Sequence, residues 1–504
     1  MSLARAQGVI IQGVSGLIVT IEAYLSQGLP GMSLVGLPDT SVGESRDRVR
    51  AAIQNSQLPW PAERRITVGL SPASVHKRGA MLDLGIALAI LTAHKQIPER
   101  LDVVAIGELA LDGSVRDVTG VIVATIAARQ AGKEVILVPH QQVMQAMLVP
   151  GIQAIGVSSL QDAVSFLRGE PRDEAKSEPA RDPEYHDLDL ADVRGQQQAR
   201  LALEIAAAGG HHIGMLGSPG IGKSMLAARL PTILPELDDE LAMQVTSVHS
   251  VAGLLKQDQG LIRQPPFQSP HHTATTASLI GGGNSIVKVG MVSLAHGGVL
   301  CLDEAAEFDR VTLDALRIPL ESGQVVIARS GFTVVLPARF QLVLASNPCP
   351  CGKFIDAGVD CICTPTVRRR YMSRISGPLL DRIDLRVTLH KPTLADFDEQ
   401  LGGPESSADV ALRVALARKR AAKRFLDYPW SLNAHVPGAL IRRQFPLHPE
   451  AMKYLRQSFG GLSARGIDRV MRVAWTIADL HENDQPTIND VKLALEFRGG
   501  DALH

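Results

Sequence analysis

A glycine-rich stretch in the middle of the chain has the spacing of a loop that binds phosphate. It fits the pattern G-x-x-x-x-G-K-[ST] at every fixed position, over Gly217, Ser218, Pro219, Gly220, Ile221, Gly222, Lys223 and Ser224. Glycines let successive backbone N–H groups turn inward around a phosphate. Lys223 would then reach the β- and γ-phosphates of a bound nucleotide, and the Ser224 hydroxyl would hold Mg²⁺.

The residues on either side supply the elements that such a loop needs. His212–Leu216 predicts a short buried strand, and Ser224–Leu230 predicts a helix whose positive N-terminal end attracts phosphate. The alternative is a glycine-rich turn that matches the pattern by chance. The flanking elements favour binding of ATP.

Two acids that suit the same chemistry end an apolar strand. Gly298–Leu302 predicts this strand, and Asp303 and Glu304 follow it directly. Such a strand delivers Asp303 to Mg²⁺ at the C-terminal edge of a sheet, where α/β proteins bind ligands. Glu304 would polarise the attacking water as a general base. The pair also occurs in purely structural strands, but its place after a phosphate loop favours hydrolysis of ATP.

Strands alternate with helices in the first part of the chain, which predicts a layered α/β domain. The predicted strands are Leu17–Ala23, Arg65–Leu70 and Val135–Pro139, and the predicted helices are Ser45–Gln54 and Leu82–Ala93. The stretch Pro171–Tyr185 has three prolines and eight charged residues, and it predicts a linker. Residues 405–504 have apolar positions at i, i+3 and i+4 spacing, which predicts helices.

Composition limits the class of protein. A chain of 504 residues is too long for one core, and its net charge of −1 provides no overall basic field for nucleic acid or membrane. We find no signal peptide and no apolar run long enough to span a bilayer. Four of the five cysteines lie in one short segment, which argues against a disulfide framework. These features predict a cytoplasmic protein that does not contact a membrane.

Three segments of the N-terminal part resemble the Lon-protease-type domain that opens ComM/YifB proteins, a magnesium-chelatase-like AAA+ family. The segments are Gly28–Gly31, Val35–Pro38 and Gly107–Gly113. Lon proteases use a Ser–Lys dyad in this fold, but the matching stretches here place Met81 at the serine and Ile122 at the lysine. A thioether and an alkyl group cannot perform acyl transfer, so we expect no protease activity.

The same resemblance extends to the ATPase motifs. It implies that Val193, in the stretch Val193-Arg194-Gly195-Gln196, lies beside the adenine, although a plain helix start would explain this stretch too. Phe340–Ser346 predicts a third apolar strand, and Asn347 after it would be sensor 1, which orients water near the γ-phosphate. The alternative is a turn asparagine before proline.

Two arginines receive roles from the resemblance alone. Arg382 would be the finger that reaches the ATP of a neighbouring subunit, with Arg374 as the second candidate. The alternative for Arg382 is a salt bridge to Asp381 or Asp384. Arg465 would be sensor 2, which touches the γ-phosphate from the helical lid, and its alternative is an exposed helix position.

Two insertions bear on the substrate. The first is expected from about Pro265 to Gly290, where His271 and His272 are metal ligands or, as we favour, structural residues. The second, Val325–Val335, predicts a hairpin resembling the pre-sensor-1 hairpin of the MCM/chelatase clade. Arg329 at its tip would grip a DNA backbone in the pore, or it would be solvated on the surface.

The cysteine-rich segment has the order C-x-C…C-x-C. Cys349, Cys351, Cys361 and Cys363 would hold a structural Zn²⁺ in a tetrahedron of thiolates, or they are reduced free thiols. Cys301, inside an apolar strand, is expected to be a small apolar residue. A basic helical segment over 413–424 is a solvated face or an outer track for DNA.

These observations predict an α/β fold of four parts. A Lon-protease-like (ribosomal S5 domain 2-like) domain without its dyad covers 1–168 and a linker covers 169–186. An AAA+ P-loop core with a helix-2 insert and the hairpin covers 187–400, and a helical lid covers 401–504.

The family resemblance implies an ATP- and Mg²⁺-dependent ring, expected to be a hexamer, because an arginine finger acting in trans needs a closed head-to-tail interface. It further implies a DNA motor that promotes branch migration and integrates incoming single strands during natural transformation. The competing class is a chelatase-like or chaperone-type ATPase that remodels a protein or a metal-insertion partner. A third class is a regulatory ATPase that does not translocate a polymer.

Overall fold

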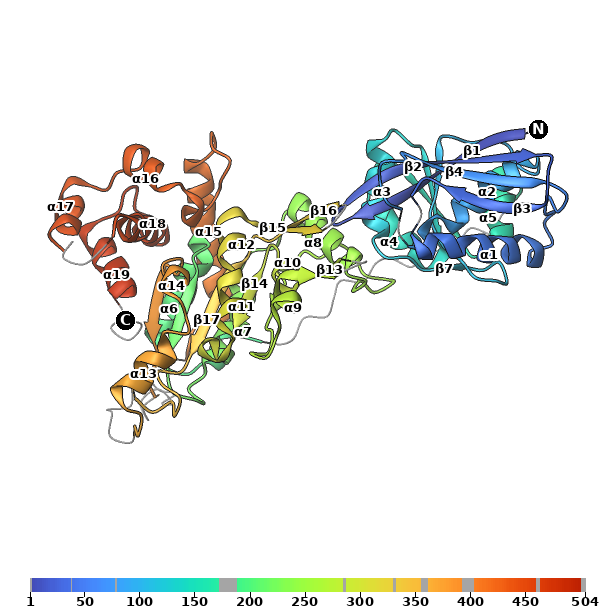
Figure 1. Cartoon of the computed structure of the whole chain (residues 1–504). Helices are drawn as coiled ribbons and strands as arrows, with labels where there is room; N and C mark the ends of the chain where they lie inside the picture. Colours follow the sequence, from blue (N-terminus) through green and yellow to red (C-terminus); the bar gives the residue numbers. More distant parts are fainter. Residues whose placement is uncertain are drawn as a thin grey trace. The chain divides into compact units, whose positions relative to one another are not determined.

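A computed structural model gives the fold of the chain (Figure 1). It describes residues 2–37, 39–77, 79–171, 188–283, 287–329, 332–354, 361–391, 403–458 and 463–499. Most of the expected linker therefore lies outside the described residues. The chain divides into two compact units, of which the first contains 1–184 with 242–262 and 326–336, and the second contains the remaining residues.

The first unit is built on a mixed seven-stranded sheet in the order β3-β4-β2-β1-β5-β8-β9. Its strands are β1 (Ser2–Gln12), β2 (Ser15–Ser26), β3 (Gly31–Val35), β4 (Arg65–Ser71), β5 (Val103–Ala105), β8 (Val135–Pro139) and β9 (Gln153–Val157). The long pair β1–β2 is antiparallel and runs in register from Ser2 opposite Leu25 to Gln12 opposite Ser15. Apolar side chains alternate along β2, as the sequence predicts for a strand with one buried face.

Helices cover both faces of this sheet, because neighbouring strand residues join two different apolar clusters. Ala105 packs with α1 (Thr40–Asn55), α2 (Asp83–Ala93) and α5 (Leu160–Arg168), whereas Val104 packs with α3 (Val121–Gln130). The helices and strands that the sequence predicts here are present within a few residues of their expected bounds. This layered α/β fold is the fold of a Lon-protease-like domain.

Two segments from within the ATPase part of the sequence pack in the first unit. The end of α8 (Asp239–Val251) accepts a backbone hydrogen bond of 3.0 Å from Gly120 to Ser250. The predicted hairpin is present as β15 (Gln324–Arg329) and β16 (Phe332–Pro337). It packs on the turn between β1 and β2, where a Cβ atom added to Gly13 would lie 2.6 Å from Cγ1 of Val334.

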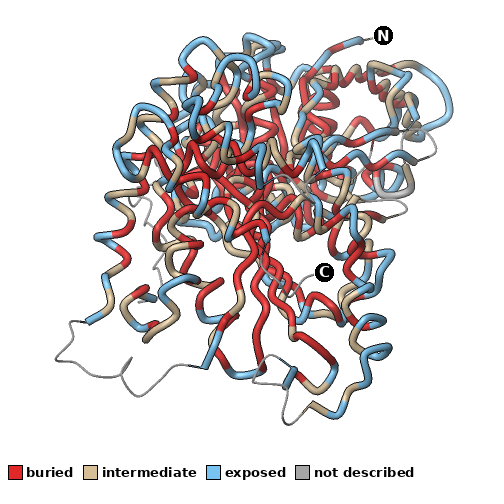
Figure 2. The backbone as a smooth tube through the Cα atoms, turned by 90° about the vertical axis from the view of Figure 1, so that its left-hand side faces the viewer, coloured by how far each residue is buried: buried red, intermediate tan, exposed pale blue. Residues whose placement is uncertain are grey.

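The second unit contains a parallel five-stranded sheet in the order β11-β14-β17-β10-β18. Its strands are β11 (Phe267–Gln268), β14 (Val299–Leu302), β17 (Gln341–Ser346), β10 (Ile213–Leu216) and β18 (Leu385–Thr388). All residues of β10, β14 and β17 are buried, as expected for a parallel sheet covered on both faces. Figure 2 shows the buried residues gathered in the interior.

The edge strand β11 corrects the expected limits of the first insertion. Phe267 and Gln268 pair in parallel with Val299 and Leu300, so they belong to the core sheet although they lie within the range 265–290 assigned to the insertion. The strand is two residues long and has no visible period, which is why the sequence pattern does not reveal it. The residues after it form α9 (Thr276–Ile280) and the short pair β12 (Gly281–Gly282) and β13 (Lys288–Val289).

The C-terminal region is helical, as predicted. It contains α15 (Ser407–Arg424), α16 (Gly438–Gln444), α17 (Pro449–Gln457), α18 (Ala464–Leu480) and α19 (Ile488–Gly499). Ser463 caps α18 by accepting a hydrogen bond from the Gly466 N–H. Over the part of the chain that the structure describes, no helix combines the length and the apolarity needed to cross a membrane.

Candidate active site

The residues expected to bind ATP lie at one edge of the parallel sheet of the second unit. The phosphate loop follows β10, Asp303 and Glu304 follow β14, and Asn347 follows β17. These three strands are neighbours and run parallel, so their C-terminal ends meet at the same edge. The Gly217 N–H donates to the carbonyl of Ser346 at 3.2 Å and ties the loop to the end of β17.

The phosphate loop has the backbone shape that its glycines permit. Gly220 and Gly222 have φ angles of +76° and +99°, in the left-handed region that favours glycine. A Cβ atom added to either residue would point into open space. The loop is therefore an open cradle that a phosphate group can enter, followed by α7 (Lys223–Arg229).

Lys223 is held inside this cradle by polar groups. Its Nζ donates to the carbonyls of Gly217 and Ser218 at 2.7 and 2.9 Å, and to Oδ1 of Asn347 at 3.0 Å. Burial lowers the pKa of Lys223, and the nearby carboxylates of Asp303 and Glu304 oppose this shift. A phosphate anion would favour the charged form of the amine, which fits the expected role of this residue.

Ser224 and Asp303 form the oxygen pair expected to bind Mg²⁺. The Ser224 hydroxyl donates to Oδ2 of Asp303 at 2.5 Å, and the Glu304 N–H donates to Oδ1 of Asp303 at 2.9 Å. Hydroxyl and carboxylate oxygens are ligands that Mg²⁺ prefers. The residues present thus fit a nucleotide with its metal ion.

Glu304 has a partner that the sequence analysis missed. Nδ1 of His272 lies 3.2 Å from Oε2 of Glu304, and the backbone of Glu304 is left-handed with a φ of +52°. His271 stacks on His272 with ring centroids 4.1 Å apart. The sequence places these residues 32 positions apart, so only the pairing of β11 with β14 brings them together.

Family models and relatives agree with this geometry. Three models match, described as magnesium chelatase subunit ChlI over 189–397, subunit ChlI of Mg-chelatase over 21–142 and magnesium chelatase subunit ChlI C-terminal over 404–498. The chain is 48% identical over 502 residues to the uncharacterized protein Rv2897c of Mycobacterium tuberculosis, with 99% of each chain covered.

Two further relatives carry family names. The chain is 40% identical over 507 residues to the uncharacterized protein YifB of Escherichia coli, covering 100% of this chain and 98% of that one. It is 41% identical over 513 residues to the competence protein ComM of Haemophilus influenzae, covering 99% and 98%. The chain belongs to the ComM/YifB family of magnesium-chelatase-like AAA+ ATPases. ATP and Mg²⁺ are the ligands that this family implies.

The Lon-like domain of this ComM/YifB protein also has a wider similarity. The chain is 28% identical over 184 residues to the Lon protease of Mycolicibacterium smegmatis, which covers 35% of this chain and 24% of that protein. At the two positions of the dyad, Met81 is buried in the short helix Ala80–Leu82 and Ile122 is buried in α3. Both side chains are part of the apolar interior of the domain.

The two candidate finger arginines of this ComM/YifB chain have partners within the same chain. Arg382 pairs with Glu321, from α12 (Arg317–Ser322), and donates to the carbonyl of Pro378 at 2.6 Å. The salt-bridge alternative named Asp381 or Asp384, but the carboxylate in contact is that of Glu321. Arg374 donates to Oε2 of Glu307 at 3.0 Å, three residues after Glu304.

The remaining predicted site residues, two for ATP and one for DNA, lie on different elements. Val193 is buried at the end of the short helix Leu190–Asp192. Arg465 is exposed in the first turn of α18. Arg329 is the last residue of β15, and the hairpin turn after it lies outside the described residues. The structure gathers the phosphate loop, Asp303 and Asn347 by hydrogen bonds, and no such bond joins Val193 or Arg465 to them among the described residues.

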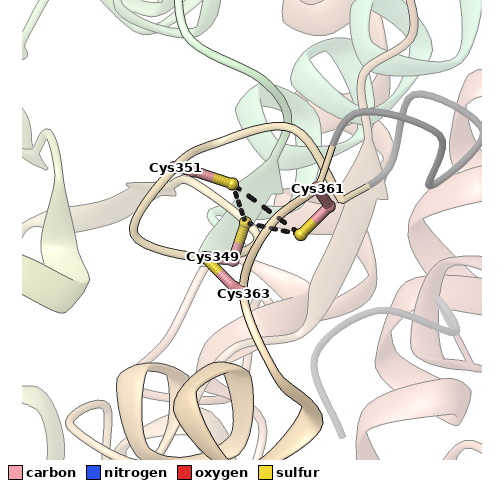
Figure 3. A group of neighbouring side chains, drawn as sticks. All are labelled: Cys349, Cys351, Cys361 and Cys363. Carbon is pink, nitrogen blue, oxygen red and sulfur yellow. Dashed lines mark hydrogen bonds between the residues drawn. The ribbon is translucent and has the colours of Figure 1, made fainter.

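The four clustered cysteines converge in the second unit (Figure 3). Sγ of Cys349 lies 3.3 Å from Sγ of Cys351 and 3.8 Å from Sγ of Cys361, and the last two are 3.7 Å apart. All four ligand atoms, including that of Cys363, lie within 4.8 Å of one another. A hydrogen bond from the backbone of Lys353 lowers the pKa of Cys351 to about 6, which favours its thiolate.

Most of the basic segment of 413–424 is used in packing. Arg413 pairs with Glu204 and Glu405, Arg420 pairs with Glu482, Arg424 pairs with Asp479, and Arg418 donates to the carbonyl of Ala207. Only Lys419 and Lys423 of the six basic side chains are exposed. These contacts favour a structural face over an outer DNA track.

Proposed function

We propose that this protein is an ATP-driven DNA motor that promotes branch migration and supports the integration of single-stranded DNA during natural transformation. The observation that carries the proposal is the ATP site at one sheet edge, in a chain 41% identical over its length to a competence protein. Competence denotes uptake of DNA, so the polymer proposed for this motor is DNA.

In this proposal each residue of the site has its own role in the hydrolysis of ATP. Bound ATP with Mg²⁺ supplies the phosphoryl group that is transferred. The phosphate loop and Lys223 would bind its phosphates, while Ser224 and Asp303 would hold Mg²⁺. Glu304 accepts a proton from the attacking water, and Asn347 orients that water. In the structure, Nζ of Lys223 donates a hydrogen bond to Oδ1 of Asn347. A phosphate that binds Lys223 would replace Asn347 as the acceptor and so release the Asn347 side chain.

We further propose that the protein acts as a ring, with a hexamer as the expected size. Arg382 is the finger for the ATP of the neighbouring subunit, and Arg465 contacts the γ-phosphate from the lid. In one chain Arg382 binds Glu321, so assembly would exchange this carboxylate for the phosphate of the neighbour. Val193 lies beside the adenine in this proposal. The site of action is the cytoplasm.

Arg329 is the proposed DNA contact. It ends β15, beside the turn of the hairpin, and a guanidinium there would bind the phosphate backbone. The test is the ATPase rate with and without forked DNA over a range of salt concentrations. We expect DNA to raise the rate and its apparent affinity to fall steeply as salt increases.

The matched variants are Arg329→Ala and Arg339→Ala, since Arg339 is an exposed arginine just outside the hairpin. Arg329→Ala should weaken DNA stimulation and reduce its salt dependence, and Arg339→Ala should retain both. A wild-type rate that is indifferent to forked and single-stranded DNA would remove the DNA motor.

The second candidate is a chelatase-like ATPase that remodels a protein or a metal-insertion partner. It is favoured by the three family models, which all carry the description of the magnesium chelatase subunit. An ATPase rate unaffected by DNA but raised by a bound protein would support this class.

Zn²⁺ is the ion that we propose for the cysteine cluster. Thiolates ~2.3 Å from a central zinc lie about 3.8 Å apart in a tetrahedron. The Cys349–Cys361 and Cys351–Cys361 separations of 3.8 and 3.7 Å are close to this value, and the Cys349–Cys351 separation of 3.3 Å is shorter. Metal analysis of the purified protein should find one zinc per chain, and a clearly substoichiometric content would reject this assignment.

A further inference from the structure

The cysteine cluster is directly joined to the ATP site by the chain. Cys349 follows Asn347 after a single proline, and Asn347 receives the hydrogen bond from Lys223 of the phosphate loop. Cys349 is fully buried, whereas the other three cysteines are half-buried. The first ligand of the cluster is therefore fixed in the interior, two residues from a side chain that contacts the phosphate loop.

A second contact joins the cluster to the phosphate loop itself. Gly352 directly follows Cys351, the second cysteine of the first C-x-C pair. Its φ of +75° lies in the region that favours glycine. A Cβ atom added to it would lie 2.3 Å from Cδ and 2.6 Å from Cγ of Pro219. The backbone of the cysteine segment thus presses on the ring of a phosphate-loop residue, without space for a larger side chain.

The thiols of the cluster accept hydrogen bonds from its own backbone. The backbone of Lys353 bonds Cys351, that of Cys351 bonds Cys363, and that of Cys363 bonds Cys361. Bonds of this kind fix the direction in which each sulfur points. All the cysteines are free thiols, so the segment has no covalent cross-link of its own.

We propose that a zinc ion in the cysteine cluster holds the nucleotide site in its binding shape, by fixing Asn347 on one side and Pro219 on the other. The inference rests on the proposed zinc and on the proposed ATP site. Four ligands from two C-x-C pairs would restrain the segment from Asn347 to Gly352, whose two ends contact Lys223 and Pro219 of the phosphate loop. Without the ion, only weak hydrogen bonds between the sulfur atoms would join the four side chains, and the segment would lose this restraint.

The test measures zinc and nucleotide binding separately. Wild-type protein, a Cys361→Ser variant and a Cys301→Ala control are analysed for zinc by mass spectrometry and for the Kd of a fluorescent ATP analogue. Cys301 is the matched thiol, because it is buried in β14 outside the cluster. Cys361→Ser should lose the zinc and bind the nucleotide at least tenfold more weakly, and Cys301→Ala should retain both.

A third variant separates the contact from the metal. Gly352→Ala changes no thiol, so it should retain zinc and still weaken nucleotide binding, because its methyl group displaces Pro219. Removal of zinc from the folded wild-type protein with a chelator should weaken binding reversibly, with recovery on adding zinc back. This measurement does not depend on the folding of a variant.

The outcomes are distinct. A wild-type protein without zinc overturns the proposal, as does a zinc-free protein that binds nucleotide with wild-type Kd. Failure of wild-type, zinc-loaded protein to bind nucleotide would instead remove the ATP site of the proposed function. DNA stimulation of ATPase is measured separately, so its absence leaves the zinc inference intact.

Discussion

At the scale of single residues, the carboxylate of Glu304, the proposed general base, is in contact with a histidine side chain. His272 lies 3.2 Å from Glu304, and both side chains are partly exposed to solvent. A contact of this kind contributes about 0.5–1 kcal/mol, which corresponds to a rate factor of roughly two to five. His272 would thus restrain the carboxylate of Glu304.

The first prediction concerns this restraint. His272→Ala should raise the ATPase rate in the absence of DNA by roughly two- to fivefold, because it frees the carboxylate of Glu304. His271→Ala is the control, since His271 stacks on His272 and hydrogen bonds Thr273 but does not contact Glu304. A slower rate for His272→Ala, with His271→Ala near wild type, would mean that His272 positions Glu304 for catalysis.

A buried ion pair provides the second prediction. Asp384 accepts hydrogen bonds from Arg469 and from His211, and its carboxylate is almost fully buried. Burial raises the pKa of Asp384, but the charge of Arg469 and the hydrogen bond from His211 outweigh it, so the pKa lies well below its ordinary value. Arg469 also donates to the carbonyl of Arg382, and this bond joins α18 to the segment that precedes β18.

Arg469→Met should therefore lower the free energy of unfolding by about 3–5 kcal/mol at pH 7, because it leaves a buried charge without its partner. Without the charge of Arg469, burial is the largest influence left on Asp384 and should raise its pKa against the hydrogen bond from His211. The stability of the variant should then fall as pH rises above the unfolded value of about 3.9. The difference from wild type should be smaller at pH 4 than at pH 7, and it should shrink further below pH 4, where wild-type Asp384 loses the stability that its lowered pKa provides. Denaturant unfolding at both pH values measures it, and an Arg469→Met, Asp384→Asn protein should recover part of the loss at pH 7.

At the scale of elements, the hairpin β15–β16 has an apolar side that packs in the Lon-like unit. Ile327, Val334 and Leu336 are buried, while Val326 and Val335 on the opposite side are exposed. The turn at Gly13 contacts the buried side. This packing would hold in place the strand β15, which ends at Arg329, the residue proposed to contact DNA.

The third prediction tests this packing. Gly13→Val should release the hairpin, because the new side chain would meet Val334 and the carbonyl of Val335, at 2.6 and 3.1 Å from its Cβ. Gly132→Val is a matched control, since Gly132 has a similar φ of +69° but nothing within 4 Å of an added Cβ. Hydrogen exchange over 326–336 should rise in Gly13→Val alone. Equal exchange in both variants would show that backbone strain, and not the contact, determines the effect.

The elements also show what the sequence can and cannot predict. Strands β2, β10, β14 and β17 are predictable because their apolar patterns are local, and the phosphate loop is predictable because its residues are contiguous. β11 is too short to have a period, and the pair of His272 with Glu304 arises only when β11 and β14 align. The sequence predicts the hairpin but not its partner, because an apolar face does not specify what covers it.

At the scale of the whole molecule, the proposed ring divides each ATP site between two subunits. Glu304 belongs to the subunit that binds the nucleotide, and Arg382 belongs to the neighbour. Such fingers contribute about 10³–10⁵ to the rate in other NTPases. In the single chain Arg382 binds Glu321, which keeps the finger paired before a neighbour supplies a phosphate.

The fourth prediction follows from this division. Glu304→Gln and Arg382→Ala should each lose at least about 10³-fold in ATPase rate when assayed alone. Mixed rings should recover activity, because an Arg382→Ala subunit keeps its Glu304 and can receive Arg382 from a Glu304→Gln neighbour. The recovered fraction should depend on the mixing ratio and be greatest near equal amounts. A control mixture of Glu304→Gln with Lys223→Ala should stay inactive, since Lys223 and Glu304 serve the same nucleotide and the Lys223→Ala subunit still lacks its phosphate contact. If the first mixture also stays inactive, while both variants assemble with the wild type, Arg382 does not act across a subunit interface and the ring mechanism loses its basis.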